Sequence, residues 1–251
     1  SIKAKTEMIE GLSDATAGPG DRWNCEAFIV EGLSPGGSLK AARKNTKYAA
    51  IIPLRGKVKN VSESNADQMM DNRELFTIFR VIGLGIHVNN VTTGCQTAEE
   101  AYERIKKYSR FGKVIIATDA DEDGLAIQNG LLYAISKFAR FMLDFGLIYV
   151  AESPIFEQGG QYFYPSDSRQ PGTQFPVGLN PSKHFRRFKG LGSLDKDDVY
   201  NAFYDTSKRR LFRVSTDGID FAMTLVEDIN ARKQLLYDKG ILSNPYNFKE
   251  L

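Results

Sequence analysis

Short runs of apolar residues, many of them β-branched, recur up to residue 152 and are separated by longer segments with helical spacing. A continuous apolar run of this length is typical of a strand that is buried on both faces of a sheet. Four runs fit this pattern and predict strands at residues 27–31, 49–54, 114–119 and 147–152.

Helical patterns lie between these strands, at residues 38–47, 65–82, 98–108 and 124–145. The third has the clearest start, because Thr97 followed by Glu100 matches a capping box. Gly146 is placed to end the fourth. Strands that alternate with helices predict an α/β fold, with a mostly parallel sheet and helices on both of its faces.

The amino-acid composition and the periodicity of the sequence change after Pro154. Residues 157–185 are rich in Gly, Pro, Ser and Gln, and they predict an irregular excursion with a hairpin at Gly159 and Gly160. Two helical stretches follow, at 194–204 and 220–239. We therefore divide the chain into an N-terminal extension (1–24), an α/β domain (25–153) and an irregular, partly helical tail (154–251).

Composition adds little by itself. The 33 basic and 31 acidic residues leave a net charge of +2, and 42% of the residues are hydrophobic, as in an ordinary globular protein. Two cysteines without a zinc-type spacing indicate a reduced, cytosolic protein. No apolar stretch reaches the ~20 residues of a membrane span. The polar start at Ser1 predicts no signal peptide and suggests a fragment or a processed subunit.

Three carboxylates, Asp119, Asp121 and Asp123, alternate directly after a predicted buried strand. Such a cluster is self-repelling unless it holds a cation, and oxygen ligands favour Mg2+ or Ca2+. An EF-hand is excluded, because its twelfth position would be Gly130 and a strand precedes the loop. A solvated acidic turn at the start of a helix remains the alternative.

Glu31 ends another predicted strand and is followed by a glycine-rich turn at Gly36 and Gly37, which we expect to open a helix at Ser38. In an open parallel sheet, ligands bind at the carboxyl ends of the strands. Adjacent strand ends would therefore bring Glu31 beside the aspartates. Four carboxylates at one edge could hold one or two Mg2+ ions for chemistry at a phosphodiester.

Basic residues are concentrated by position. Residues 32–60 contain seven of them and no acid; Arg55 and Lys57 follow a strand that ends at the same edge as Glu31, which suits a polyanionic substrate. Residues 183–189 interleave cations with aromatic residues, and Lys208, Arg209 and Arg210 form a third cluster. These two later runs could follow a phosphate backbone or equally form domain contacts, and a solvated surface is the plain reading of any charge run.

Four motifs closely resemble those of the type IIA DNA topoisomerases, the gyrase B and topoisomerase II family. They are FIVEGLSPGGS at 28–38, PLRGKVKNV at 53–61, TDADEDG at 118–124 and RFKGLG at 187–192, in the order of the family. The resemblance implies a Toprim domain followed by its tail. Leu33 stands where the family often has an acid, and Leu125 where gyrases have His, which suggests a divergent, phage-type branch.

The resemblance also implies roles for particular residues. Glu31, Asp119, Asp121 and Asp123 would be catalytic and bind Mg2+ for DNA cleavage and religation, with Lys57 as a further catalytic residue. The expected contacts with double-stranded DNA are Lys40, Arg43, Arg55, Lys57, Arg187 and Lys189. The whole enzyme would be an ATP-dependent type II topoisomerase of the cytoplasm, or of the host cytoplasm for a phage.

Two parts of that enzyme are not recognised in this sequence. The family's nucleophile is a tyrosine preceded by arginine, and none of the eleven tyrosines has that neighbour. No ATP-binding motif occurs, so ATP would bind a region outside the chain. We therefore expect a partner subunit or domain that carries the tyrosine, an ATPase region, and an isolated chain that is inactive. Two other functions remain open: another Toprim enzyme such as a primase or nuclease, and a non-catalytic DNA-binding or assembly module.

Overall fold

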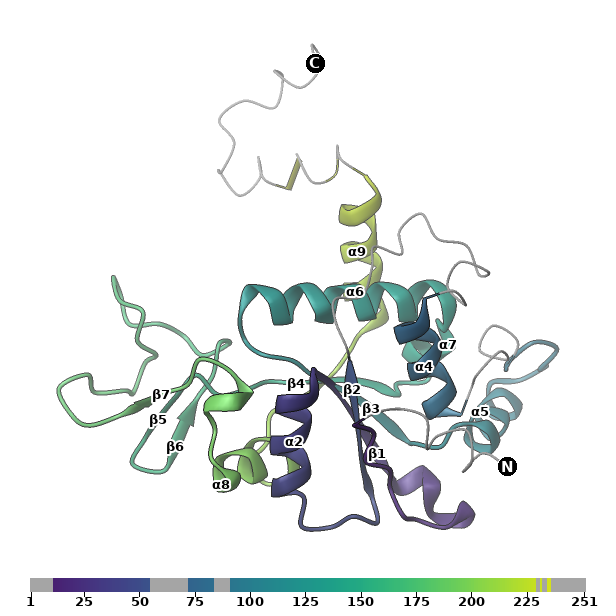
Figure 1. Ribbon diagram of the computed structural model, residues 1–251. Coiled ribbons are helices and arrows are strands. Elements are labelled where there is room, and N and C mark those ends of the chain that lie inside the picture. Colours follow the sequence, from purple (N-terminus) through teal and green to yellow (C-terminus); the bar gives the residue numbers. More distant parts are fainter. Residues whose placement is uncertain (1–10, 55–71, 84–90, 229–230, 232–233, 236–251) are drawn as a thin grey trace.

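The computed structural model describes residues 11–54, 72–83, 91–228, 231 and 234–235. Its main sheet has the strand order β2-β1-β3-β4-β8 (Figure 1). The first four are parallel to their neighbours, and the last pairs antiparallel with β4. Their bounds are β1 Glu26–Glu31, β2 Ala49–Leu54, β3 Lys113–Ala117, β4 Ile148–Ala151 and β8 Leu211–Arg213. The four predicted strands and the mostly parallel α/β sheet are thus confirmed.

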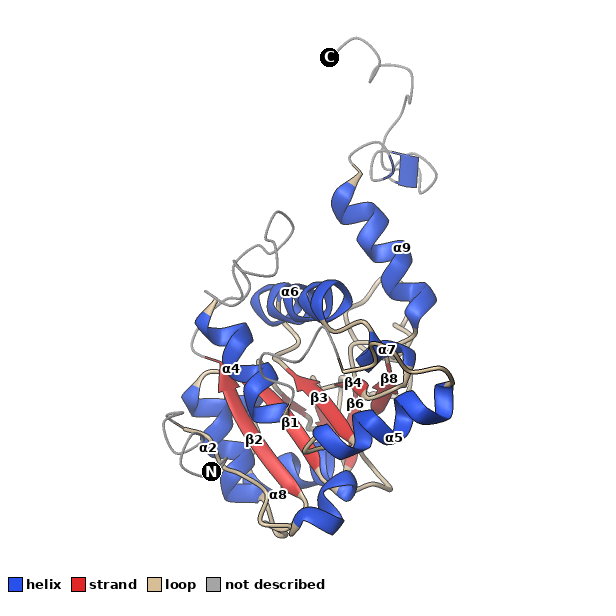
Figure 2. Ribbon diagram, turned by 90° about the vertical axis from the view of Figure 1, so that its right-hand side faces the viewer, coloured by secondary structure: helices blue, strands red, loops and turns tan. Residues whose placement is uncertain are grey.

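Helices cover both faces of the sheet, as predicted (Figure 2). Alternate strand residues point to opposite faces: Ala27 and Ile29 belong to one core, and Phe28 and Val30 to the other. The first core is closed by α4 Arg73–Ile82, α5 Ala98–Tyr108, α6 Glu122–Phe138 and α7 Phe141–Asp144. The second is closed by α2 Leu33–Ala42 and by α8 Lys196–Val199 with the π-helical turn Tyr200–Tyr204.

The start of the helix predicted at 98–108 is confirmed by its capping residue, and the helix predicted at 65–82 begins, in the structure, after the cap Asn72. The Thr97 hydroxyl accepts a hydrogen bond from the Glu100 N–H at 3.1 Å, as a capping residue should, although the Glu100 carboxylate accepts from the N–H of Gln96 instead. Asn72 caps α4 in the same way, with a 3.2 Å bond from the Leu75 N–H. The predicted part of that helix before residue 72 lies outside the described residues.

The expected helix start at Ser38 was wrong, because α2 begins at Leu33 and contains Gly36 and Gly37. The chain turns at Gly32 instead, whose φ is 79°. Gly36 faces the sheet, and a Cβ there would lie 3.5 Å from both Val30 and Pro53. Gly36 thus lets the helix approach the strands closely rather than forming a turn before it.

The predicted helix 124–145 is divided in two. It begins at Glu122, breaks at Ala139 and resumes as α7, and Gly146 follows with φ 69°, the conformation expected of a glycine after a helix. Within the described residues no helix is long and apolar enough to cross a membrane.

The tail is irregular and partly helical, as predicted. Gly159 and Gly160 connect β5 Phe156–Gln158 to β6 Gln161–Phe163, which confirms the hairpin, and β7 Arg186–Arg187 completes a small second sheet. The helix predicted at 220–239 corresponds to α9, but α9 begins earlier, at Thr216 after the cap Ser215, and ends at Glu227, before the extended residue Asp228. Most of the predicted helix after residue 228 lies outside the described residues. Two short 3-10 helices, Pro19–Asn24 and Leu191–Ser193, complete the named elements.

The tail is built into the core of the α/β domain. Phe188, Leu191 and Phe203 pack in the same cluster as Phe28 and Ile115, and β8 extends the main sheet. The division near residue 153 therefore marks a change in amino-acid composition. The second face of the sheet is covered in part by residues that come after residue 153.

A buried ion pair ties the tail to the start of β1. Both Arg209 side-chain NH groups donate to Glu26, at 2.6 and 2.8 Å, and Lys113 donates at 3.0 Å. The exposed fractions of the Arg209 and Glu26 side chains are 7% and 19%. Burial raises the pKa of Glu26, but these two cations outweigh it and leave that pKa below its ordinary value.

We predict that Arg209→Ala lowers the free energy of unfolding by about 2–4 kcal/mol, because it leaves Glu26 buried with only Lys113. Since the pKa of Glu26 is lowered by folding, its contribution is present above the carboxyl's unfolded pKa and is lost as the pH falls through its folded value. In urea unfolding, the difference in the free energy of unfolding between the parent chain and Arg209→Ala should therefore become smaller below about pH 4.

The exposed neighbour provides the control: Lys208→Ala should change stability by less than about 0.5 kcal/mol. A deficit in Arg209→Ala that stays constant from pH 7 to pH 3 would contradict a role for the Glu26 charge.

Candidate metal and DNA site at the carboxyl ends of β1 and β3

The two acidic segments lie at the same edge of the sheet. Strand β1 runs parallel to β3 with Val30 opposite Ala117, so Glu31 ends one strand where Thr118 and Asp119 follow the other. The sequence predicted this placement from the strand ends alone. On the other side of β1, β2 ends at Leu54, whose carbonyl accepts a 2.8 Å hydrogen bond from the Gly32 N–H.

A tight turn connects β3 to α6 and fixes the first two aspartates. Asp121 caps the helix, with its Oδ1 accepting from the Gly124 N–H at 2.8 Å. A Cβ on Gly124 would lie 2.1 Å from the Asp119 carbonyl oxygen, so a glycine is required there. The alternative of an acidic helix start thus describes Asp121 correctly, and it does not account for Asp119, which precedes the helix.

The tail reaches back across the sheet edge to hold Asp119. The Leu191 N–H donates to Asp119 Oδ1 at 2.7 Å, across 72 positions in the sequence. A Cβ on Gly190 would lie 2.5 Å from Asp119 Oδ2, so the carboxylate rests directly against the glycine backbone. Sequence reasoning missed both residues, because it assigned this motif to cationic contacts with DNA.

The environment of Asp119 disfavours its charge. Burial raises the pKa of its carboxyl, the nearby charge of Asp121 raises it further, and the Leu191 N–H partly opposes both effects. A bound cation would offset both the cost of burying the Asp119 charge and its repulsion from Asp121. The pair Asp119 and Asp121 is therefore where this edge has the strongest electrostatic reason to take a metal ion.

The four proposed ligands are gathered at one edge but not closed into a cage. In the described part of the chain, no three His, Cys, Asp or Glu side chains are arranged to hold a metal ion. An all-oxygen set with two interacting carboxylates still fits Mg2+, which commonly keeps several waters and binds one or two carboxylates. The assignment of Glu31, Asp119, Asp121 and Asp123 as ligands stays a prediction.

The predicted DNA contacts are distributed unevenly. Arg55 and Lys57 lie outside the described residues. Lys40 is exposed in the last turn of α2. Arg43 follows that helix, and its NH1 donates to the carbonyl of Ala49 at 2.6 Å, at the start of β2 and thus at the edge opposite Glu31. This placement gives Arg43 a structural role.

The two later basic runs separate into structural and exposed residues. Arg186 pairs with Glu157, Asp195 and Asp198. Arg210 pairs with Glu152 and Asp167, and Arg209 with Glu26, so these three arginines form contacts within the chain. Arg187 and Lys189 are exposed, and Lys189 is the neighbour of Gly190 that lies against Asp119.

A groove of about 370 Å³ lies beside Asp119. Its walls are mostly apolar and come from α6, β4 and the tail, with Leu125, Val150 and Phe212 among them. Leu125 and Phe212 are each about half exposed, at 50% and 51%. Leu125, which departs from the gyrase pattern, thus forms part of the wall of the groove next to the acidic turn.

Comparison with known proteins identifies the family. A family model described as the Toprim domain matches residues 26–152. The chain belongs to the Toprim family. It is also similar to DNA gyrase B of Staphylococcus aureus, with 31% identity over 229 residues that cover 88% of this chain and 33% of that protein. DNA gyrase B of Staphylococcus epidermidis is 31% identical over 228 residues, which cover 87% and 33%.

These relatives place this Toprim chain in the type IIA topoisomerase branch, as its four motifs predicted. The similarity extends well beyond the Toprim match and includes most of the tail. The chain spans about a third of the length of the curated relatives it matches.

We predict that Gly190→Ala separates the tail from Asp119, because the new methyl group would overlap the carboxylate. The free energy of unfolding should fall by about 1–3 kcal/mol. Gly192→Ala is the matched control, since a Cβ at that glycine meets nothing within 4 Å. Equal stability of the two variants in urea unfolding would show that the contact at Gly190 is not tight.

Proposed function

We propose that this chain is the metal- and DNA-binding part of a type IIA DNA topoisomerase and supports double-strand cleavage and religation by a tyrosine on a partner. The observation that carries the proposal is the acidic edge itself. Glu31 ends β1, Asp119 follows the end of the adjacent parallel strand β3, and the tail motif of the same family holds Asp119 in place.

In this proposal Glu31, Asp119, Asp121 and Asp123 are the ligands of one or two Mg2+ ions. When bound, Mg2+ would offset the negative charge that develops on the phosphate and the leaving oxygen. The chain's own residues do the remaining work: the Leu191 N–H and the Gly190 backbone hold the Asp119 carboxylate in one orientation. In this proposal Glu31 also relays a proton to or from the 3′ oxygen of the cleaved strand.

The proposed contacts with double-stranded DNA are Lys40, Arg55, Lys57, Arg187 and Lys189, and Lys57 is also proposed as a catalytic residue on the ground of the motif that contains it. Two observations support this assignment: Arg187 and Lys189 are both exposed, and Lys189 adjoins Gly190, which lies against Asp119. Arg43 is left out, because its guanidinium bonds backbone carbonyls at the other edge of the sheet.

The rest of the reaction needs other parts. The similarity to a third of gyrase B leaves room for an ATPase region that binds ATP and for a separate polypeptide or domain with the nucleophilic tyrosine. The complete assembly would be an ATP-dependent topoisomerase of the cytoplasm, and this chain alone would not cleave DNA.

Metal binding can be tested without activity. We expect Mg2+ to stabilise the chain against unfolding by about 1.4 kcal/mol when its free concentration is tenfold above its Kd. Asp119→Asn should lose this response, because it removes a ligand charge while keeping an oxygen for the Leu191 N–H. Glu99→Gln, an exposed carboxylate in the first turn of α5, is the control.

An equal response of Asp119→Asn and the parent chain would place the metal elsewhere. No response of the parent chain, even with DNA present, would favour the non-catalytic DNA-binding or assembly module.

Cleavage is tested by reconstitution with the tyrosine-bearing partner, DNA and Mg2+. We predict that Asp121→Asn lowers the rate of DNA cleavage by about 100-fold or more, since it removes one negative charge from the proposed Mg2+ ligands. Asparagine still caps a helix, so α6 is preserved. Asp217→Asn, an exposed residue in the first turn of α9, should cleave normally. Undiminished cleavage by Asp121→Asn would overturn its proposed role.

A further inference from the structure

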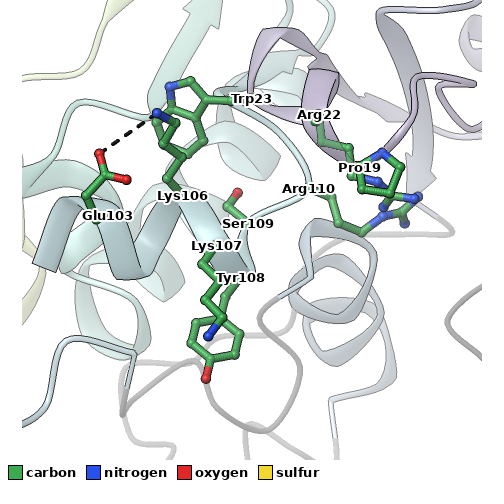
Figure 3. Close-up of a pocket in the computed structure, with 10 residues that line it drawn as sticks. Pro19, Arg22, Trp23, Glu103, Lys106, Lys107, Tyr108, Ser109 and Arg110 are labelled. Carbon is green, nitrogen blue, oxygen red and sulfur yellow. Dashed lines mark ion pairs between the residues drawn. The ribbon is translucent and has the colours of Figure 1, made fainter. Parts of the chain in front are cut away.

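A second cleft is lined by residues that precede β1 and β3, and it therefore lies at the opposite edge of the sheet from the acidic turn. Figure 3 shows the residues that line it. It has a volume of about 510 Å³ and is formed by the 3-10 helix before β1 and by the last turn of α5 together with the residues that follow it. Strand β1 separates this cleft from Glu31, and six residues of strand at ~3.3 Å each span roughly 20 Å. The cleft is therefore separate from the proposed metal site.

Cations dominate the lining of this cleft. Arg22 comes from the 3-10 helix, and Lys106 and Lys107 come from α5. In Figure 3, Lys106 extends toward Trp23 and Lys107 extends beside Tyr108. Glu103 is the acidic residue of the lining, and it is paired with Lys106 at 3.9 Å. Within the described part of the chain, the side chains of Arg22 and Lys107 form no hydrogen bond or ion pair, and the Lys107 ammonium lies over the Tyr108 ring at 6.0 Å from its centroid.

Acids close to the cleft are already engaged. Asp21, the neighbour of Arg22, pairs with Lys47 at 2.7 Å, and Asp14 pairs with Arg110. The last turn of a helix favours basic residues, which explains Lys106 and Lys107 by themselves. It does not explain Arg22, which comes from a segment about 85 positions earlier and faces the same cleft.

Aromatic side chains and a fixed backbone complete the cleft. Trp23 is partly buried and meets the ring of Tyr102 edge-to-face, with centroids 5.5 Å apart. Tyr108 lines the cleft and is 46% exposed. A Cβ on Gly112 would lie 2.0 Å from the Trp23 carbonyl oxygen, so the wall that carries Trp23 is packed tightly against the start of β3.

We propose that this cleft binds a nucleotide unit, with Arg22 and Lys107 contacting its phosphate and Trp23 and Tyr108 packing against its base. Unpaired cations beside aromatic rings are the combination that binds single-stranded nucleic acid and nucleotides, and the volume is that of an ordinary small-ligand site. The unit comes from a free nucleotide or from a single strand of nucleic acid, which share this chemistry. The inference is independent of the proposed metal site.

The chain offers a direct probe, because Trp23 is its only tryptophan. Its fluorescence is measured in the full 251-residue chain during titration with ADP in the absence of Mg2+, with a thymidine hexanucleotide, with pyrophosphate and with polyglutamate. We expect ADP or the hexanucleotide to change the emission saturably. Arg22→Ala combined with Lys107→Ala should weaken this binding at least tenfold and reduce its salt dependence.

Two further variants serve as controls. Lys196→Ala removes an exposed lysine of α8 and should bind as the parent does. Asp121→Asn should also retain binding, so that failure of the proposed metal site does not affect this result. Circular dichroism shows whether each variant is folded.

The ligands distinguish the sources. A response to ADP supports a free nucleotide, and a response to the hexanucleotide alone supports a single strand. Polyglutamate or pyrophosphate that binds as tightly as either one would overturn recognition of a nucleotide. No saturable response to ADP or the hexanucleotide, or a response that survives the double substitution, would overturn the proposal.

Discussion

The contact between Asp119 and the backbone at Gly190 and Leu191 connects the two halves of this chain at the point where its chemistry is proposed to occur. It joins residues 72 positions apart through a 2.7 Å hydrogen bond and a packing contact that leaves no room for a Cβ. At the opposite edge of the same face, Arg209 binds Glu26. The tail is therefore fixed at both ends of the strands that it covers, and its helices complete the core between these two points.

This arrangement explains why the Lys-Gly-Leu-Gly segment accompanies an acidic strand end. Burial and the neighbouring charge of Asp121 both disfavour the charged form of the Asp119 carboxyl. The Leu191 N–H partly opposes these effects, and its hydrogen bond holds the carboxylate against the tail. The lysine of the segment, Lys189, is exposed beside this contact, whereas the backbone of the next two residues makes it.

Much of the fold could be predicted from the sequence because its signals are local. Apolar runs gave the four strands, Thr97 marked a helix start, and Gly159 and Gly160 marked a hairpin. Parallel pairing then placed Glu31 beside the aspartates. Local signals failed at Gly36, since a glycine that permits close packing looks the same in sequence as one that permits a turn. They also failed for β8, whose three residues are too few to show a period.

Charge was the property least open to prediction, because a basic residue in a sequence does not reveal where its acidic partner lies. Arg209 pairs with Glu26, 183 positions away in the sequence. Arg186 pairs with Asp198 in the tail, and Arg210 pairs with Asp167 in the tail and with Glu152 just before it. The near-zero net charge thus reflects many internal pairs and not a uniform surface. The cations that remain exposed or unpaired are the informative ones: Lys189 lies next to the acidic turn, whereas Arg22 and Lys107 lie in the cleft at the other end of β1. Because exposed charges separated by about 20 Å are screened from each other at physiological salt, the cations of the cleft and those beside the acidic turn have little electrostatic influence on one another.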